Sequence, residues 1–217
     1  AARTASSVPP ATSIRDLAWL YYQAELYGEA TILYQQGLDL QPTSLAFRIG
    51  LANCLFKRTK YDDALPLYRQ AEAEPYLETS VYQQGLCYYY LGKYDTAKTC
   101  LRRALLIDTA NIGAHYNLGL TLMDLEDYPE AVRSFENAIR HSRSDIITSS
   151  YDRIGVAQYE LKKTNAALAA FRRSIEENPR NSRAYYDMGV LYENLGDDRT
   201  KALECYRKVV SIEKPSD

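Results

Sequence analysis

The stretch that decides the fold comprises residues 81–105, VYQQGLCYYYLGKYDTAKTCLRRAL. In its first half, Val81, Gly85 and Tyr88 recur at spacings of four and three residues, which places them on one face of an α-helix. Gly92 follows, and a glycine readily adopts the left-handed conformation that caps a helix C-terminus. The pattern therefore predicts an amphipathic helix that ends in a tight turn.

The second half of the same stretch predicts another amphipathic helix. Ala97, Leu101 and Ala104 again recur at spacings of four and three residues. We expect Asp95 to be the N-cap of this helix, because a carboxylate there accepts hydrogen bonds from free backbone amides. Small and large residues alternate on the two apolar faces, so the helices can approach closely and interlock. A single pair of this size cannot bury its apolar face and needs a similar pair beside it.

The same pattern recurs along the chain at a nearly fixed period. The small residue of the first helix returns at successive gaps of 34, 33, 34, 36 and 34 residues. This period and residue set resemble the tetratricopeptide repeat, a helix pair of about 34 residues. The small residues are Ala18, Ala52, Gly85, Gly119, Gly155 and Gly189. The large residues of the second helices are Tyr34, Tyr68, Leu101, Phe135, Phe171 and Tyr206.

The resemblance implies an all-α fold, a right-handed superhelical solenoid of antiparallel helix pairs. We expect this domain over residues 11–216, and a linker or flexible segment over residues 1–10, which are small and contain Ser and Pro. Since the last apolar face has no following helix in the sequence, we expect a fragment of a longer protein. The six expected repeats span residues 11–44, 45–77, 78–111, 112–147, 148–181 and 182–216.

The composition narrows the class of function. The formal net charge of −2 argues against a general nucleic-acid binder, which is usually markedly basic. No apolar run reaches the roughly 18 to 20 residues that span a bilayer. The four cysteines lie next to core positions of helices, as expected for reduced thiols in an intracellular protein. We therefore expect a cytoplasmic protein that neither binds nucleic acid nor inserts into membranes, with a cilium or another large assembly as the alternative location.

No motif in the sequence points to catalysis. The chain has no glycine-rich phosphate loop, no nucleophile elbow, and no Cys or His pair at the spacing of metal ligands. His115 occupies a core packing position and His141 lies between repeats, so we expect a structural or solvated role for both. We therefore expect no enzymatic activity, no cofactor and no metal.

The resemblance places the candidate binding site on the first helix of each repeat, because these helices line a concave groove in tetratricopeptide arrays. Solvent-facing helix positions are mostly charged, whereas these are mostly apolar or aromatic. We therefore expect a scaffold or adaptor that binds a partner peptide or helix in an apolar, tyrosine-rich groove. Packing between neighbouring first helices is the alternative for any one residue. The expected partner-binding residues are Ile49, Asn53, Phe56, Tyr82, Leu86, Tyr89, Tyr116, Leu120, Met123, Tyr159, Tyr186 and Val190.

Basic pairs follow the large core residue in three of the second helices, which form the outer face of this fold. They predict a convex basic stripe with two interpretations, a solvated face balanced by nearby carboxylates and a surface for an acidic partner. The stripe consists of Arg102, Arg103, Arg172, Arg173, Arg207 and Lys208.

Three other functions stay open at the level of the sequence. The array can be a structural subunit of a large assembly, such as a ciliary or cell-cycle complex. It can be the targeting domain of a larger enzyme. It can also self-associate through the exposed ends of the array. The fold is compatible with each of these.

Overall fold

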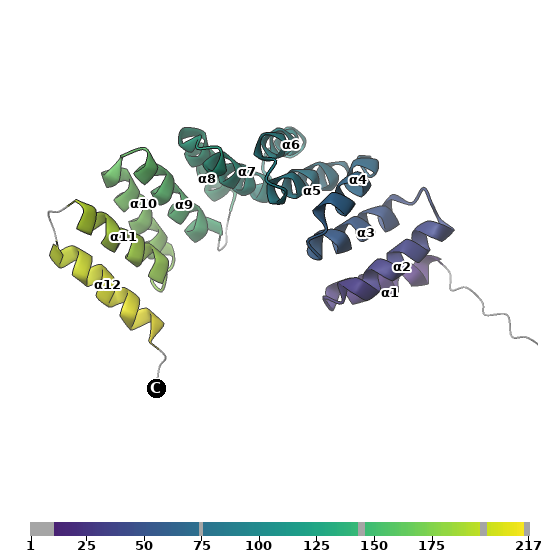
Figure 1. Ribbon diagram of the computed structural model, residues 1–217, viewed down its shortest axis with the longest axis horizontal. Helices are drawn as coiled ribbons and strands as arrows, with labels where there is room; N and C mark the ends of the chain where they lie inside the picture. The colour runs from purple at the N-terminus through teal and green to yellow at the C-terminus, as the bar shows by residue number, and fades with distance from the viewer. Residues whose placement is uncertain (1–10, 74–75, 143–145, 196–198, 215–217) are drawn as a thin grey trace, which may run out of the picture. The chain divides into compact units, whose positions relative to one another are not determined.

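The computed structural model describes residues 11–73, 76–142, 146–195 and 199–214 (Figure 1). These residues form twelve α-helices, and no strand occurs among them, which confirms the all-α class. The chain divides into two compact units, which we call the N-terminal unit (residues 1–108) and the C-terminal unit (residues 109–217). Residues 1–10, where we expect a linker, lie outside the described part of the chain. A single domain over residues 11–216 stays a prediction.

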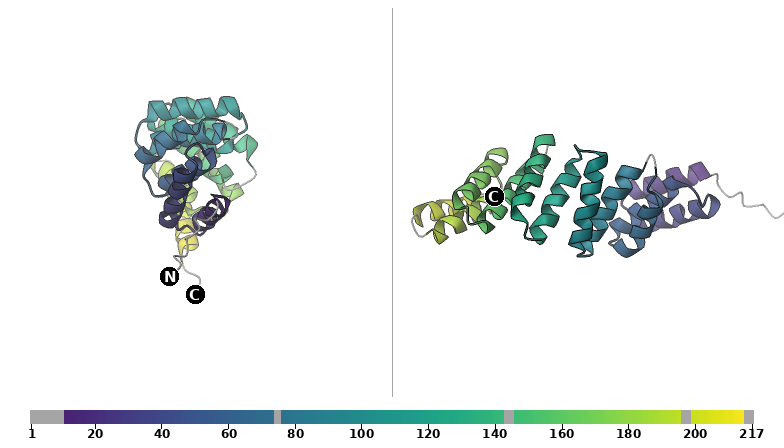
Figure 2. Two further views of the ribbon diagram at one scale, coloured as in Figure 1. Left: turned by 90° about the vertical axis from the view of Figure 1, so that its right-hand side faces the viewer. Right: turned by 90° about the horizontal axis from the view of Figure 1, so that it is seen from above.

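Three helix pairs make up the N-terminal unit. The odd-numbered helix of each pair is called the first helix, and the even-numbered one the second helix. Within this unit, each helix contacts the next along the chain, and Figure 2 shows them side by side in chain order. Their bounds are α1 (Ala11–Gln23), α2 (Tyr27–Leu40), α3 (Leu45–Lys57), α4 (Tyr61–Gln70), α5 (Leu77–Tyr90) and α6 (Tyr94–Ile107).

The C-terminal unit is built in the same way from three further pairs. Consecutive helices contact each other, and the first helices α7 and α9 also meet. The helices are α7 (Ile112–Asp124), α8 (Tyr128–His141), α9 (Ile146–Glu160), α10 (Thr164–Glu177), α11 (Ser182–Asn194) and α12 (Arg199–Glu213).

The two helices of a pair interlock through a small residue and a large one, as the sequence predicts. A Cβ atom added to Gly119 would lie 2.6 Å from the ring of Phe135. One added to Gly155 would lie 2.6 Å from the ring of Phe171. Both rings are buried. Since a side-chain carbon cannot approach another this closely, glycine is what allows these helices to pack at this distance.

Among the described residues, five turns within pairs contain one residue in the left-handed conformation. Gly92 has φ +70°, which confirms the predicted C-terminal cap of α5. The amide of Lys93 then donates to the carbonyl of Tyr88 at 2.9 Å and closes the turn. In other pairs non-glycine residues hold this conformation, among them Glu126 at 58° and Lys162 at 61°. Backbone strain is therefore present in those turns and absent at Gly92.

The predicted N-cap of α6 is wrong. The helix begins two residues too early for this cap, and Lys93 occupies the cap position without a side-chain hydrogen bond. Asp95 lies in the first turn, where the helix dipole favours its charge and Lys98 Nζ contacts it at 3.2 Å. Helix α8 has the kind of N-cap that was predicted for α6, since the side chain of Asp127 accepts a hydrogen bond from the amide of Glu130.

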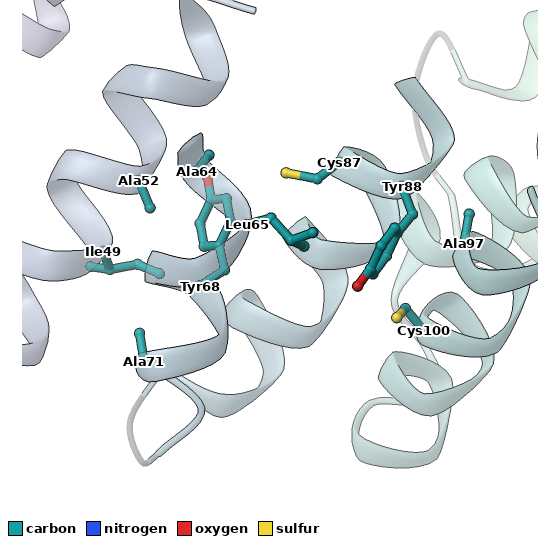
Figure 3. Close-up of a cluster of buried hydrophobic side chains, with 10 residues drawn as sticks. All are labelled: Ile49, Ala52, Ala64, Leu65, Tyr68, Ala71, Cys87, Tyr88, Ala97 and Cys100. Carbon is teal, nitrogen blue, oxygen red and sulfur yellow. The ribbon is translucent and has the colours of Figure 1, made fainter. Parts of the chain in front are cut away.

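Figure 3 shows the buried side chains that join α3, α4, α5 and α6 in the core of the N-terminal unit. Tyr68 is fully buried, and its hydroxyl donates a hydrogen bond of 2.8 Å to Oδ1 of Asn53. Burial raises the pKa of the Cys87 thiol to about 12. All four cysteines are buried free thiols, as the sequence predicts. The core cluster comprises Ile49, Ala52, Ala64, Leu65, Tyr68, Ala71, Cys87, Tyr88, Ala97 and Cys100.

Candidate functional site

In the N-terminal unit, the six predicted partner-binding residues differ in their exposure. Ile49 and Leu86 are buried, at 7% and 9% exposure. The structure corrects the prediction for these two, because their side chains fill the space between helices. Asn53 is half-buried, and its side chain accepts the hydrogen bond from Tyr68. Tyr82 is half-buried on α5.

Phe56 and Tyr89 belong to a cluster of aromatic rings near the C-terminal ends of α3 and α5. The ring of Tyr61 stacks on that of Tyr90, with centroids 4.9 Å apart and 11° between the planes. The ring of Phe56 meets both edge-on, at 5.3 and 5.8 Å. Tyr89 meets Tyr90 edge-on at 5.5 Å. These rings use much of their surface on one another, so the cluster stabilises the packing of consecutive pairs.

In the C-terminal unit, the predicted residues lie on α7, α9 and α11. Tyr116 is half-buried, and its ring meets that of Phe135 edge-on at 5.6 Å. Tyr186 is 54% exposed, and its ring lies 5.9 Å from that of Tyr206. The other four are all half-buried, namely Leu120, Met123, Tyr159 and Val190.

Two cavities of about 200 Å³ each lie beside these helices, and we call them the first pit and the second pit. Val156 of α9 forms part of both walls, so the pits are neighbours. They bring together three predicted residues, Tyr116 in the first pit, and Tyr159 and Val190 in the second. The first pit is lined by Tyr116, Ser149, Asp152, Arg153, Val156 and Arg183. The second pit is lined by Val156, Tyr159, Phe171, Asp187, Val190 and Leu191.

The predicted partner-binding residues leave out five polar residues that line the pits, and one of these is Asp152. Ser149 and Arg153 are four positions apart on α9, and Arg183 and Asp187 are four positions apart on α11. Residues at this spacing share one helix face, and this face borders the predicted groove positions. The spacing of four residues, repeated on both helices, was the signal in the sequence that could have identified them. They were left out because they are charged or polar, whereas the predicted binding surface is apolar.

Asn181 fixes the position of Asp152 in the wall of the first pit. Nδ2 of Asn181 donates to Oδ1 and Oδ2 of Asp152, at 3.0 and 2.9 Å. The same nitrogen lies 2.8 Å from Oγ of Ser174. Asn181 also caps α11, because its side chain accepts a hydrogen bond of 3.3 Å from the amide of Ala184. Both oxygens of Asp152 are therefore used within the protein.

Asp187, in the wall of the second pit, lacks such partners. Its Oδ2 is buried and accepts no hydrogen bond from the described residues. Nε of Arg183 lies 3.8 Å from this oxygen, which is longer than a hydrogen bond. Burial is the main reason why the pKa of the Asp187 carboxyl is raised, and the negative charge of Asp152 raises it further. The positive charges of Arg183 and Arg153 act in the opposite direction and lower this pKa. The second pit thus contains a carboxylate whose Oδ2 has no hydrogen-bond donor among the described residues.

Several basic residues of the second helices have polar partners within their unit. The pairs are Arg103 with Glu72, Arg172 with the hydroxyl of Tyr192, and Arg173 with Glu176. These three contacts fit a solvated face with balanced charge, one of the two interpretations of the stripe. Arg207 and Lys208 are exposed and border a cavity of about 540 Å³ beside α11 and α12.

Within the described parts of the chain, no three His, Cys, Asp or Glu side chains could together hold a metal ion. The rings of His115 and His141 stack, with centroids 5.9 Å apart and 7° between the planes. Nε2 of His115 lies 3.0 Å from the carbonyl oxygen of Thr109. Both histidines therefore contribute contacts at one end of the α7–α8 pair. None of the described helices is long and apolar enough to cross a bilayer.

Family models identify the repeat. Models of the tetratricopeptide repeat match residues 15–77, 149–181 and 170–202. A model described as anaphase-promoting complex, cyclosome, subunit 3 matches residues 67–138. With the interlocked helix pairs, these matches show that the chain belongs to the tetratricopeptide repeat family.

Curated relatives share this repeat at low identity. Tetratricopeptide repeat protein 8 of Caenorhabditis elegans is 24% identical over 75% of this chain and 32% of its own length. Anaphase-promoting complex subunit 3 of Schizosaccharomyces pombe is 24% identical over 90% and 29%. BBSome complex member BBS4 of Bos taurus is 24% identical over 89% and 37%. The chain spans about a third of the length of these relatives. A fourth relative, from Hordeum vulgare, is a probable peptide N-acetylglucosaminyltransferase, 28% identical over 76% of this chain and 18% of its own length.

Solved structures share the fold. The crystal structure of MamA has a TM-score of 0.69 at 22% identity, and the match covers 75% of this chain and 94% of MamA. That of YrrB, described as a tetratricopeptide repeat protein with an unusual peptide-binding site, has a TM-score of 0.67 at 25% identity. This match covers 83% of this chain and 92% of YrrB. Both likenesses confirm a helical repeat array.

Proposed function

We propose that the chain is a protein–protein interaction module that binds a partner segment on the first-helix face of its C-terminal unit. The observation that carries this proposal is the pair of neighbouring pits between α7, α9 and α11. Their walls combine aromatic and aliphatic side chains with a few polar groups, which is the usual composition of a binding site. An extended peptide or one face of a helix can place single side chains in pits of this size.

The comparisons support a role in assemblies. Two relatives are, by name, a subunit of the anaphase-promoting complex and a member of the BBSome complex, and YrrB is described as having a peptide-binding site. We propose a scaffold or adaptor role inside the cell, without catalysis by these repeats. The transferase relative matches this chain over only 18% of its length, so its reaction gives no support for an activity here.

A structural subunit that contacts its neighbours through second helices is the second candidate function. The cavity of about 540 Å³ beside α11 and α12, bordered by Arg207 and Lys208, favours it. Under this alternative, replacing Arg207 and Lys208 with Glu disrupts assembly more than any change in the pits. Under the interaction-module proposal, the same charge reversal leaves the partner set unchanged.

The experiment is affinity purification of the tagged chain from its native cell, with quantification of the co-purifying proteins. In the test variant, Tyr159→Ala is combined with Val190→Ala, which truncates two half-buried side chains in the wall of the second pit. We expect one or a few partners to fall at least about tenfold, since central interface residues often contribute about 2 kcal/mol or more.

The matched control removes apolar side chains of similar size elsewhere. Leu106 is 84% exposed on α6, and Val210 is exposed on α12. Leu106→Ala combined with Val210→Ala should keep every partner. Thermal unfolding of both variants by circular dichroism checks that the fold is intact. An unchanged partner set in the folded pit variant would contradict the proposal.

A further inference from the structure

The two pits differ in the hydrogen-bonding groups that they leave unused. In the first pit, Arg153 makes no hydrogen bond or ion pair with another residue that the structure describes. Asp152, in the same wall, already accepts from Asn181 at both oxygens. In the second pit, Oδ2 of Asp187 lacks a donor within the described residues. The first pit therefore offers donors, and the second offers the carboxylate of Asp187, whose side chain is 26% exposed although its Oδ2 is buried beside Arg183.

Arg183 links the two pits. Its side chain lines the first pit, and its Nε lies 3.8 Å from Oδ2 of Asp187, which lines the second. The Arg183 side chain is 62% exposed, and an ion pair this exposed contributes little stability. A cation of the partner placed on Asp187 can therefore replace Arg183 and release its guanidinium toward an anion in the first pit.

We propose that the C-terminal unit selects a partner segment that carries a carboxylate side chain and a basic side chain close together. The carboxylate occupies the first pit, where Arg153 and Arg183 donate charge-assisted hydrogen bonds to it. The basic side chain occupies the second pit, where its aliphatic part packs on Val156 and Val190 and its cationic end reaches Asp187. This inference rests on the proposed function and names the chemistry of the partner segment.

The opposite arrangement is disfavoured by charge. A basic side chain in the first pit would meet two guanidinium groups, those of Arg153 and Arg183, against the single carboxylate of Asp152, which already accepts from Asn181. An acidic side chain in the second pit would meet Asp187, the charged residue of that wall. Specificity of this kind depends on repulsion as much as on attraction. Each pit has room for one side chain, and the shared wall at Val156 requires the two side chains to be near each other in the partner.

The test begins with a random peptide library displayed on phage and selected on the whole chain. We expect enriched peptides to contain Asp or Glu and Lys or Arg at a fixed, short spacing. A labelled synthetic peptide of enriched sequence is then titrated by fluorescence polarisation against the parent chain and the Asp187→Asn and Arg153→Gln variants.

The variants and the peptide are changed together, so that each charge is matched with its expected partner. Asp187→Asn should weaken binding of the parent peptide at least about tenfold, but should not weaken binding of a peptide whose basic residue is replaced by Met. Arg153→Gln should show the same dependence on the acidic residue of the peptide. Glu177→Gln on α10 and Arg133→Gln on α8 replace exposed charges away from both pits; they are the controls and should leave the affinity unchanged.

The outcomes separate this inference from the proposed function. Peptides that need Tyr159 and Val190 but carry no acidic and basic pair would overturn the inference alone. Unchanged affinity for Asp187→Asn would do the same. No enriched peptide, or peptides that bind the Tyr159→Ala, Val190→Ala variant as tightly as the parent, would overturn both. Asp187→Asn is nearly isosteric and removes a buried charge, so we expect it to fold.

Discussion

Replacing Phe135 with Ala removes the ring around which α7 and α8 pack. The ring is fully buried, lies against Gly119 and meets the edge of Tyr116. Truncating a buried Phe costs about 3–5 kcal/mol, because the transfer free energy of the ring is lost and a cavity remains. Since whole domains are stable by about 5–15 kcal/mol, we expect a large drop in the free energy of unfolding. In an array with nearest-neighbour coupling, the C-terminal unit should then melt ahead of the N-terminal unit.

Gly119→Ala tests the same contact from the opposite helix. Ala favours a helix over Gly by about 0.5–1 kcal/mol, but the added Cβ would lie 2.6 Å from the ring of Phe135, so we expect destabilisation. Gly28→Ala in α2 is the matched control, because nothing lies within 4 Å of its Cβ and the helix should gain stability. In the double variant of Gly119 and Phe135, the new methyl group enters the cavity, so the two costs should not add.

The assay is equilibrium unfolding in urea, followed by far-ultraviolet circular dichroism. The four free energies of the parent, the two single variants and the double variant form a thermodynamic cycle. We expect the double variant to be more stable than the sum of the single effects predicts. A cost below about 1 kcal/mol for Phe135→Ala, or additive effects, would refute the interlock between Gly119 and Phe135.

Three further predictions follow from the structure. Because burial raises the pKa of the Cys54 and Cys87 thiols to about 11 and about 12, Ellman's reagent should modify them only on unfolding; rapid reaction in the folded chain would contradict this burial. The raised pKa of Asp187 means that the folded chain binds this proton more tightly than the unfolded chain, so stability from this group falls as pH rises above the ordinary range of an Asp. Asp187→Asn should therefore gain more stability over the parent near pH 7 than at about pH 3, measured by urea unfolding, and an equal gap at both pH values would count against it. Lys162→Gly should stabilise, and Gly92→Ala destabilise, by about 1 kcal/mol each in thermal melts, since both positions have positive φ; opposite signs would show that the turns carry no strain.

The repeat and the interlock were predictable from the sequence because they depend on spacing alone. A period near 34 residues fixes which small residue faces which large one, as Gly155 and Phe171 illustrate. The start of α6 was predictable too, but from a comparison between repeats rather than from Asp95 itself. The N-cap directly follows the left-handed residue, so Lys93 follows Gly92 as Asp127 follows Glu126.

The exposure of residues beside the core was less predictable. Whether Ile49 faces water depends on how closely the next helix packs, and spacing does not give this distance. Gly50 marks one such approach, since an added Cβ would lie 2.3 Å from the ring of Tyr34 in the preceding pair. The charged lining of the pits was missed for a different reason, because Arg153 and Asp187 read as ordinary solvated residues until it is known that α9 and α11 line the same pits.

The most direct test of the central claim is photo-crosslinking in the native cell, with p-benzoylphenylalanine in place of Tyr186. This side chain is 54% exposed on α11, between Arg183 and Val190 in the sequence, and each of these residues lines a pit. The same crosslinker in place of Leu106, on the second helix α6, is the control. We predict a covalent adduct with one or a few partner proteins from position 186 and none of these adducts from position 106. Adducts from position 106 with no adduct from position 186 would contradict a binding site on the first-helix face.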